Sequence, residues 1–339
     1  MRRSRWAWLA PILVLVLAAA ALWLSREPPA NPEMSIGAAE PARDDSTHGT
    51  TTVPVAPPVT HPPLSAEAEA RMPTALRDLV SQADAGNPGA ACRLGSLLAQ
   101  CGLFPAHWHS EEFVANLRKR EKSAAERGDL ASANEEAQSL LIAQARLDQC
   151  GDIPDELYPR APAYLRQAAL AGERQALVQY IRGESFPPLG MIDNHQFRSP
   201  DFDVWRAEAH DLLKAQFRDG RPEAALMLLE AHSTAGGNLH LVTSPDPLLD
   251  HAYLLLVQRL FEDFEQPENW SPAPLEAAIA AEADALARRW HRENFKDRKY
   301  SMRRDLTGFQ RELLHPGHSL WPGLESTEPG CSDPSEAAP

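Results

Sequence analysis

Apolar residues between positions 65 and 315 recur at three- and four-residue spacings rather than at alternate positions. This period places one side of an α-helix against a core, and the strong helix formers Ala, Leu, Arg, Glu and Gln dominate the same stretch. Only His240 to Thr243 offers a short run with β character. Residues that typically begin helices stand at Ser110 with Glu111-Glu112, at Pro162, at Pro222 and at Ser271-Pro272. The pattern predicts an all-α region of about ten to twelve helices.

A different apolar pattern opens the chain. Nineteen uncharged residues run from Trp6 to Leu24, and three Arg lie within the five residues before them. As a helix this stretch is about 28 Å long, close to the thickness of a bilayer's hydrocarbon core. The positive flank predicts a single-pass inner-membrane anchor with a cytoplasmic N-terminus and a periplasmic remainder. The alternative is a signal peptide cleaved behind the small residues Ala19 and Ala21, although the apolar run continues past them.

Composition divides the rest of the chain. Residues 25–64 contain nine Pro in forty positions and few bulky aliphatic side chains, so they cannot bury enough apolar surface to offset their ordering entropy. Residues 316–339 are likewise rich in Pro, Gly, Ser and Glu. We therefore expect an anchor at 1–24, a Pro-rich disordered linker at 25–64, a helical domain at 65–315 and a flexible tail at 316–339.

Four glycines mark a repeat inside the helical domain. Gly86, Gly128, Gly172 and Gly220 lie 42, 44 and 48 residues apart, and each reads as a helix-ending residue in the left-handed conformation. The residues three before, four after and eight after each Gly also correspond: Ala83, Ala125, Ala169 and Phe217, then Ala90, Ser132, Ala176 and Ala224, then Leu94, Glu136, Tyr180 and Leu228. The small residues let two helices approach closely, which predicts hairpins that stack on one another.

These residues resemble the Sel-one-like repeat family, a short-hairpin relative of the tetratricopeptide repeats. Residues 83–95 and 165–180 carry the likeness, whereas the units at Gly128 and Gly220 are degenerate and all the spacings exceed the usual repeat. The resemblance implies a short α-solenoid with a concave, protein-binding face, and it implies no catalytic residue. The alternative is an irregular helical bundle in which Ala-x-x-Gly recurs by chance.

Net charge and motifs narrow the function classes. With 33 Lys and Arg against 47 Asp and Glu, the chain carries a formal charge of −14, which argues against nucleic-acid binding. The cluster His107-Trp108-His109 fits a loop better than a metal site. The pair Glu111-Glu112 fits a helix start, and the pair Glu135-Glu136 fits a solvated helix face, better than either fits a general acid–base pair. The basic run from Arg288 to Arg292 fits a solvated helix end. We therefore expect no catalytic residue, cofactor or metal.

The cysteines predict one internal bridge. Cys101 and Cys150 share the context Gln-Cys-Gly at the apparent ends of hairpin helices, which stacking would bring side by side. An oxidising compartment favours their pairing. Cys92 competes for Cys150 but is less well placed, and Cys331 in the tail is expected to be unpaired or intermolecular.

The function that we favour from the sequence is a membrane-tethered, non-catalytic adaptor for another cell-envelope protein or peptide. Its expected binding face comprises non-core residues of 88–100, 129–148 and 173–182 on the first helices of the hairpins, including Arg93 and Arg174. The alternatives are an all-helical envelope enzyme, such as a peptidoglycan-cleaving one, and a self-associating scaffold. A cleft holding one buried acid with a raised pKa would favour the enzyme.

Overall fold

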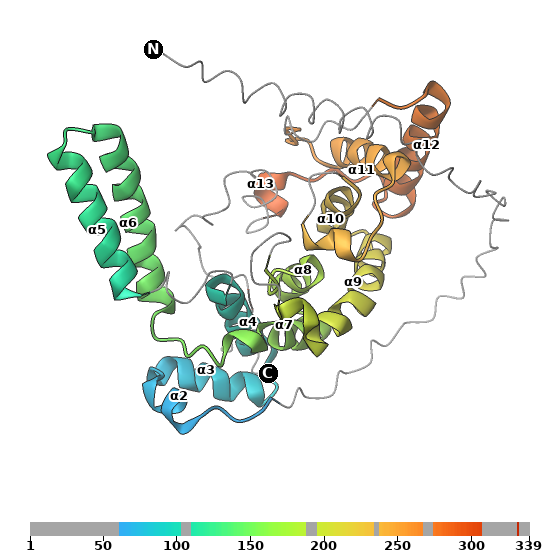
Figure 1. Ribbon diagram of the computed structural model, residues 1–339. Coiled ribbons are helices and arrows are strands. Elements are labelled where there is room, and N and C mark those ends of the chain that lie inside the picture. Colours follow the sequence, from blue (N-terminus) through green and yellow to red (C-terminus); the bar gives the residue numbers. More distant parts are fainter. Residues whose placement is uncertain are drawn as a thin grey trace, which may run out of the picture. The chain divides into compact units, whose positions relative to one another are not determined.

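A computed structural model describes the protein over residues 61–102, 110–187, 195–233, 237–266, 274–306 and 331 (Figure 1). Within these ranges the chain forms twelve α-helices and no β-strand. A single isolated β-bridge joins Phe261 to Tyr300 in this part of the chain. The predicted all-α class is therefore confirmed. No helix in this part of the chain is both long and apolar enough to cross a membrane, and the expected anchor at 6–24 lies outside the described residues.

Twelve helices follow one another along the described part of the chain. They are α2 (Ala66–Arg71), α3 (Thr74–Asp84), α4 (Pro88–Gly102), α5 (Glu111–Glu126), α6 (Leu130–Cys150), α7 (Ala161–Leu170), α8 (Arg174–Arg182), α9 (Pro200–Arg218), α10 (Pro222–His232), α11 (Pro247–Leu260), α12 (Ala277–Glu293) and α13 (Met302–Asp305). Short 3₁₀ turns lie at Tyr158–Arg160, His195–Arg198 and Asn238–Leu241. The last of these overlaps the stretch from His240 to Thr243 in which the sequence suggested β character.

Local signals in the sequence account for several helix starts. The Ser110 hydroxyl accepts a hydrogen bond from the backbone N–H of Phe113 (3.2 Å) and caps α5, and Pro222 opens α10. Pro162 lies in the first turn of α7. The start expected at Ser271-Pro272 lies outside the described residues, and α12 begins at Ala277.

The same tight turn joins four pairs of consecutive helices. In each pair the first helix ends two residues before a glycine and the next helix begins two residues after it. All four glycines have positive φ: 90° at Gly86, 74° at Gly128, 99° at Gly172 and 72° at Gly220. Residues with a Cβ rarely adopt this left-handed backbone conformation. Glycine adopts it readily and so lets the chain reverse direction between the two helices.

Burial separates one of these turns from the other three. The residues four after the glycine are fully buried at Ala90, Ala176 and Ala224, and those eight after it are buried at Leu94, Tyr180 and Leu228. At the turn of Gly128 the corresponding Ser132 and Glu136 are not buried, and Glu136 bonds Arg120 of α5 instead. The α5–α6 hairpin therefore does not repeat the packing of the other units.

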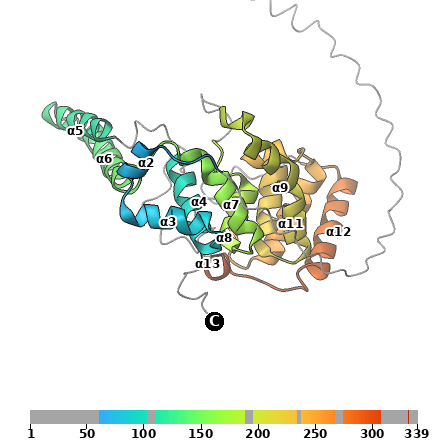
Figure 2. The same cartoon turned by 90° about the horizontal axis from the view of Figure 1, so that it is seen from below.

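Instead, the α5–α6 hairpin is an insertion between two helices that pack together. Helices α4 and α7 lie side by side in both views (Figures 1 and 2), although the hairpin separates them in sequence. A Cβ placed on Gly95 of α4 would lie only 2.9 Å from the backbone nitrogen of Leu165 in α7. Val114, Leu117 and Ala143 give the hairpin a small hydrophobic cluster of its own.

Two larger clusters form the cores of the remaining helices. The first gathers α3, α4, α7 and α8 with the start of α9, and includes Leu94, Tyr164 and Trp205. The second gathers α8 to α13, and includes Leu226 and Leu256. Trp290 of α12 packs against Tyr253 with ring centroids 4.8 Å apart, as expected for a large aromatic residue, whereas Trp270 lies outside the described residues.

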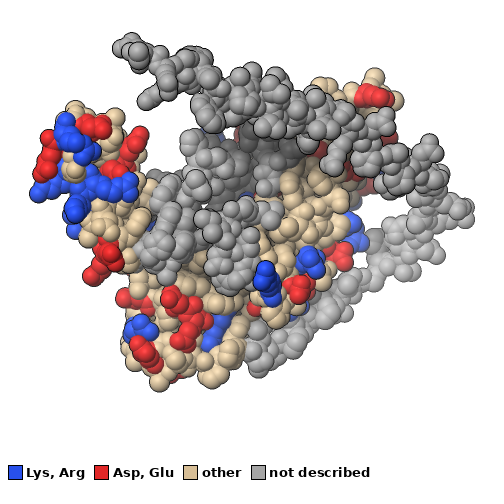
Figure 3. Space-filling view, in the orientation of Figure 1, with Lys and Arg blue, Asp and Glu red and all other residues tan. Residues whose placement is uncertain are grey.

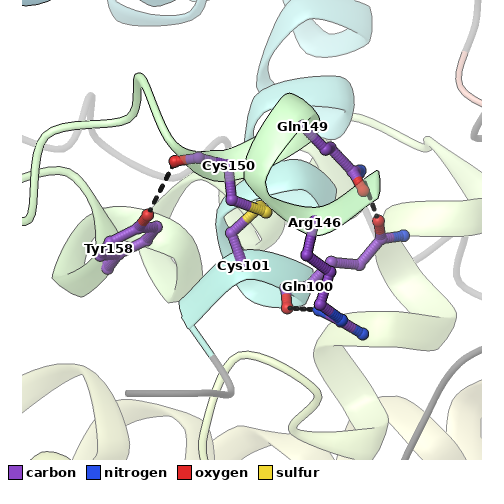
Figure 4. The surroundings of a disulfide bond; sticks show 6 residues. All are labelled: Gln100, Cys101, Arg146, Gln149, Cys150 and Tyr158. Atoms are coloured by element: carbon purple, nitrogen blue, oxygen red, sulfur yellow. Dashed lines mark hydrogen bonds between the residues drawn. A yellow bond between two sulfur atoms is a disulfide. The ribbon is translucent and has the colours of Figure 1, made fainter. Parts of the chain in front are cut away.

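A disulfide closes the base of the inserted hairpin (Figure 4). Cys101 near the end of α4 bonds Cys150 at the end of α6, with the two Cα atoms 5.7 Å apart. Gln149 donates to the Gln100 side chain at 3.2 Å, and Arg146 donates to the Gln100 carbonyl oxygen at 3.4 Å. This is the pair favoured from the sequence, but it forms where the chain leaves and rejoins the main helices rather than between stacked repeats.

The expectation for Cys331 is wrong. Cys331 is neither unpaired nor intermolecular, because it bonds Cys92 of α4, 239 residues earlier in the chain, and packs against the first core cluster. Both partners of the Cys101–Cys150 pair share a local context, whereas nothing in the residues around Cys331 indicates its distant partner. All four cysteines of the chain are thus paired.

The packed region begins earlier than residue 65. The Arg160 guanidinium donates to the carbonyl oxygen of Pro62 (2.6 Å), and Leu64 packs against the first core cluster. Residues 61–64, which were expected to belong to the linker, therefore contact the helices.

The Gly95→Ala variant tests the close approach of α4 and α7. Alanine ordinarily favours a helix by about 1 kcal/mol over glycine, but here its Cβ would overlap the α7 backbone, and overpacking costs about 1–3 kcal/mol. In urea denaturation we expect Gly95→Ala to be at least about 1 kcal/mol less stable than Gly102→Ala. At Gly102 the nearest atom to a new Cβ is 3.4 Å away, on Tyr158. Equal stability of the two variants would contradict this packing.

Removal of the Cys101–Cys150 bridge by a double substitution to serine should lower the free energy of unfolding by about 2–4 kcal/mol. The bridge closes a loop across 49 residues, so its loss releases entropy to the unfolded chain. Peptide mapping without reductant should recover Cys101 linked to Cys150 and Cys92 linked to Cys331. A peptide joining Cys92 to Cys150 would refute the assignment.

Candidate binding groove

A groove runs between α8 and α10, the helices that follow the turns at Gly172 and Gly220. Its empty volume is about 380 Å³, part of which is open to solvent. The lining comprises Gly172, Arg174, Leu177, Val178, Ile181, Gln216, Arg221, Glu223, Ala224 and Met227. Because these residues come from two successive helix pairs, the groove exists only when α8 and α10 are neighbours.

The floor of the groove is apolar. Leu177, Val178 and Ile181 lie on one side of α8, as their spacing of one and three residues allows, and Met227 faces them from α10. Ile181 and Met227 are buried, whereas Leu177 and Val178 are half-buried. The floor is thus an aliphatic surface that is only partly exposed to solvent.

An ion pair crosses one end of the groove. The exposed Arg174 of α8 bonds the carboxylate of Glu223 in the first turn of α10. Arg174 also donates to the backbone carbonyl oxygen of Asp305 at 3.4 Å, which brings α13 to the same end. The N-terminal turn of a helix stabilises a carboxylate, so α10 supports Glu223 from its other side.

Glu223 is the most informative residue of the groove. Only 4% of its surface is exposed, yet its Oε2 atom has no hydrogen-bond partner among the described residues. A buried carboxylate oxygen without a donor is costly, and because Oε2 is closed to solvent, an N–H group of a ligand would reach it only after neighbouring side chains shift.

The remaining polar groups lie at the rim. Arg221, which is exposed, and Gln216, which is half-buried, border the apolar floor. The groove therefore combines an aliphatic surface with two guanidinium groups and a carboxylate that Arg174 already bonds. A peptide segment matches this set, since its backbone supplies both N–H and C=O groups beside an apolar side chain.

The structure places only part of the expected binding face here. Arg174 and the range 173–182 form one wall of the groove, whereas Arg93 is half-buried on α4 and does not line it. Most of 88–100 is buried in α4, and 129–148 belongs to the inserted hairpin. All three ranges lie on the helices that follow a glycine turn, not on the first helices of the hairpins as expected.

The α10 side of the groove was missed from the sequence. Arg221, Glu223 and Met227 lie within seven residues after Gly220, and the lining residues of α8 lie within nine residues after Gly172, although the individual offsets differ. The recurring glycine turns were the available signal, since both walls of the groove begin just after such a turn.

Other candidates from the sequence contribute no further site. His107-Trp108-His109 lies outside the described residues, and Glu111-Glu112 occupies the exposed first turn of α5. Glu136 bonds Arg120, and Arg288 of the basic run bonds Asp284 of its own helix. Among the described residues, no group of three or more His, Cys, Asp or Glu is placed to hold a metal ion.

A second cluster of titratable groups lies where the chain enters the fold. The His61 ring lies 5.1 Å from the Tyr164 ring, centroid to centroid, and the Tyr164 hydroxyl donates to Asp84 at 2.7 Å. Burial lowers the pKa of His61 below its usual value, and the positive charge of Arg160 lowers it further. The packing of residues 61–64 therefore favours the neutral form of His61.

Replacement of His61 with Phe should weaken the pH dependence of stability. A histidine whose pKa is lower in the folded state binds its proton first in the unfolded chain, so stability falls as pH drops below about 6.5. Between pH 7.5 and 5.5 we expect a smaller fall in Tm for His61→Phe than for the unchanged protein. The fall should not vanish, because burial also lowers the pKa of His210 and His232. An identical fall in both proteins would show that His61 does not titrate in this way.

Comparisons of this chain with protein-family models, with curated proteins and with solved structures found no match.

Proposed function

We propose that this chain is a membrane-tethered, non-catalytic adaptor of the cell envelope, which binds a peptide segment of another protein between α8 and α10. The observation that carries the proposal is Glu223, a buried carboxylate whose Oε2 lacks a donor at the end of an apolar groove. Its other oxygen bonds Arg174, which suits holding a ligand better than transferring a proton.

We further propose that the hairpins form a short α-solenoid of the Sel-one-like type, interrupted by the α5–α6 insertion. Three of the four glycine turns support this interpretation, because equivalent small and large residues are buried beside each of them. The groove lies between helices that occupy equivalent positions in two successive units, where such a solenoid would present its concave face.

The proposed location rests on two independent features. The apolar stretch at 6–24 behind three Arg favours a single-pass anchor with the helical domain outside the cytoplasm. The pairs Cys92–Cys331 and Cys101–Cys150 favour an oxidising compartment, since disulfides rarely persist in the cytosol.

Photo-crosslinking in membranes tests the groove. A photoreactive amino acid at position 216 or 221 of the full chain should give one discrete adduct with a second protein, because both positions line the groove. The same amino acid at position 206 serves as a control, since Arg206 lies on α9 with 59% of its side chain exposed and does not line the groove.

A charge reversal sharpens the experiment. With the crosslinker at position 216, Arg221→Glu should lower the adduct yield several-fold, whereas Arg206→Glu should leave it unchanged. Arg221 is the better choice over Arg174, whose loss would leave buried Glu223 without its cation and destabilise the fold. The proposal fails if no adduct forms, if position 206 gives the same adduct, or if the adduct is intramolecular and leaves the mass of the chain unchanged.

A further inference from the structure

Residues 294–306, which follow α12, border the end of the groove where α8 and α10 begin. A Cβ placed on Gly220, in the turn before α10, would overlap the backbone carbonyl oxygen of Asn294. Toward the other end of the segment, the backbone carbonyl oxygen of Asp305 accepts a hydrogen bond from Arg174 of α8 (3.4 Å), and Figure 2 shows α13 beside α8. The segment therefore lies beside the start of both walls of the groove.

This segment is basic, although the chain as a whole has a formal charge of −14. It contains two Asp and five basic residues, all five of them exposed: Lys296, Arg298, Lys299, Arg303 and Arg304. Arg221, which lines the groove at the start of α10, is exposed as well. Positive charge on the segment thus adjoins positive charge on the groove.

The buried and half-buried acidic residues at this end bind groups of the protein itself. Glu223 bonds Arg174, as described above. Both carboxylate oxygens of Asp305 accept hydrogen bonds from Arg304, each at 3.0 Å. Asp263 accepts the backbone N–H of Met302 at 2.6 Å and so caps α13, and Glu173 at the start of α8 is half-buried. These carboxylates are therefore not available to neutralise the exposed basic side chains.

The exposed acidic residues are too few to cancel the exposed basic ones. Within the described part of the chain, four exposed acidic residues lie at this end of the groove: Asp219, Glu262, Glu293 and Asp297. Eight exposed basic residues lie there, namely the five of the segment together with Arg174, Arg218 and Arg221. The exposed surface at this end of the groove is therefore positive.

We propose that the groove binds an acidic segment of a partner protein. One aliphatic side chain of this ligand lies on the floor between α8 and α10, and neighbouring Asp or Glu residues contact Arg221 and the basic side chains of 294–306. Guanidinium groups suit this role because they bind a carboxylate through two parallel hydrogen bonds. The inference rests on the function proposed above and names the chemistry of the bound peptide.

A peptide fits this site better than an anionic lipid surface does. The half-buried Leu177 and Val178 lie on the floor of the groove, and the exposed Arg221 lies at its border. A peptide carries an aliphatic side chain and a carboxylate on adjacent residues, so it meets both features at once. A layer of lipid headgroups meets the charges but leaves the floor uncovered.

Another cluster of basic residues lies on the α5–α6 hairpin, but it offers no such combination. Figure 3 shows the Lys and Arg side chains of the hairpin interspersed with Asp and Glu. Arg120 bonds Glu136 within the hairpin, and no lining residue of the groove belongs to it. The exposed pair Arg118-Lys119 of α5 is therefore a matched control for the exposed pair Arg298-Lys299.

Crosslinking from position 216 of the full chain in membranes tests the charge of the ligand. We expect Arg298→Glu combined with Lys299→Glu to lower the adduct yield several-fold, and Arg118→Glu combined with Lys119→Glu to leave it unchanged. Raising the salt concentration from about 50 mM to about 500 mM should also lower the yield, because salt screens exposed charge pairs. Mass spectrometry of the adduct should find Asp or Glu close to the crosslinked position of the partner.

A synthetic probe measures the same preference directly. By fluorescence anisotropy, a short labelled peptide of two Leu flanked by Glu should bind the full chain in detergent micelles at least about tenfold more tightly than the same peptide flanked by Lys. The variant with Arg298→Glu and Lys299→Glu should lose most of this preference. Circular dichroism should show the same helix content in both double variants, since all four substituted residues are exposed.

The failure of this inference is distinguishable from that of the proposed function. An adduct whose yield does not respond to salt or to the charge reversal, or one with a partner segment that lacks acidic residues, overturns the inference and leaves peptide binding in the groove intact. An adduct to lipid, or equal affinity for the two peptides, also overturns the inference. The absence of any adduct from position 216 overturns both.

Discussion

The close contact between α4 and α7 is the constraint on which the rest of the structure depends. At Gly95 the backbone of α7 comes so near that only glycine leaves room, and this proximity holds although the α5–α6 hairpin stands between the two helices in sequence. The hairpin must therefore leave and rejoin the main helices at nearly the same point. The Cys101–Cys150 bridge occupies that point, so the disulfide and the glycine contact are two consequences of one arrangement.

Features set by a few neighbouring residues were predictable from the sequence. The glycine turns, the Ser110 cap and the start of α10 at Pro222 depend on backbone conformation within three or four residues. The same local chemistry misled at Gly128, where the same kind of turn joins the two helices of the inserted hairpin. Only Glu136, a charged residue at an otherwise apolar position, distinguished that turn in advance.

Features set by distant partners were not predictable. The bond between Cys92 and Cys331 joins residues 239 positions apart, and the groove requires α8 to lie beside α10. Glu223 illustrates the reason: as a charged residue in the first turn of a helix it has the appearance of a solvated group. Glu223 is buried because distant parts of the chain pack against it, and that burial makes its unpaired oxygen energetically costly.

The small residues that let α4 pack closely also limit what its packing contributes. Ten of its fifteen residues are buried, but Leu94 and Leu98 are the only large aliphatic ones among them. Alanine and glycine bury little apolar area, so the hydrophobic stabilisation per residue is low. Both disulfides end on this helix, and a buried hydrogen bond from Ser96 to Gln179 (2.6 Å) ties it to α8. The two disulfides thus add to the modest hydrophobic stabilisation that the small side chains of this helix supply.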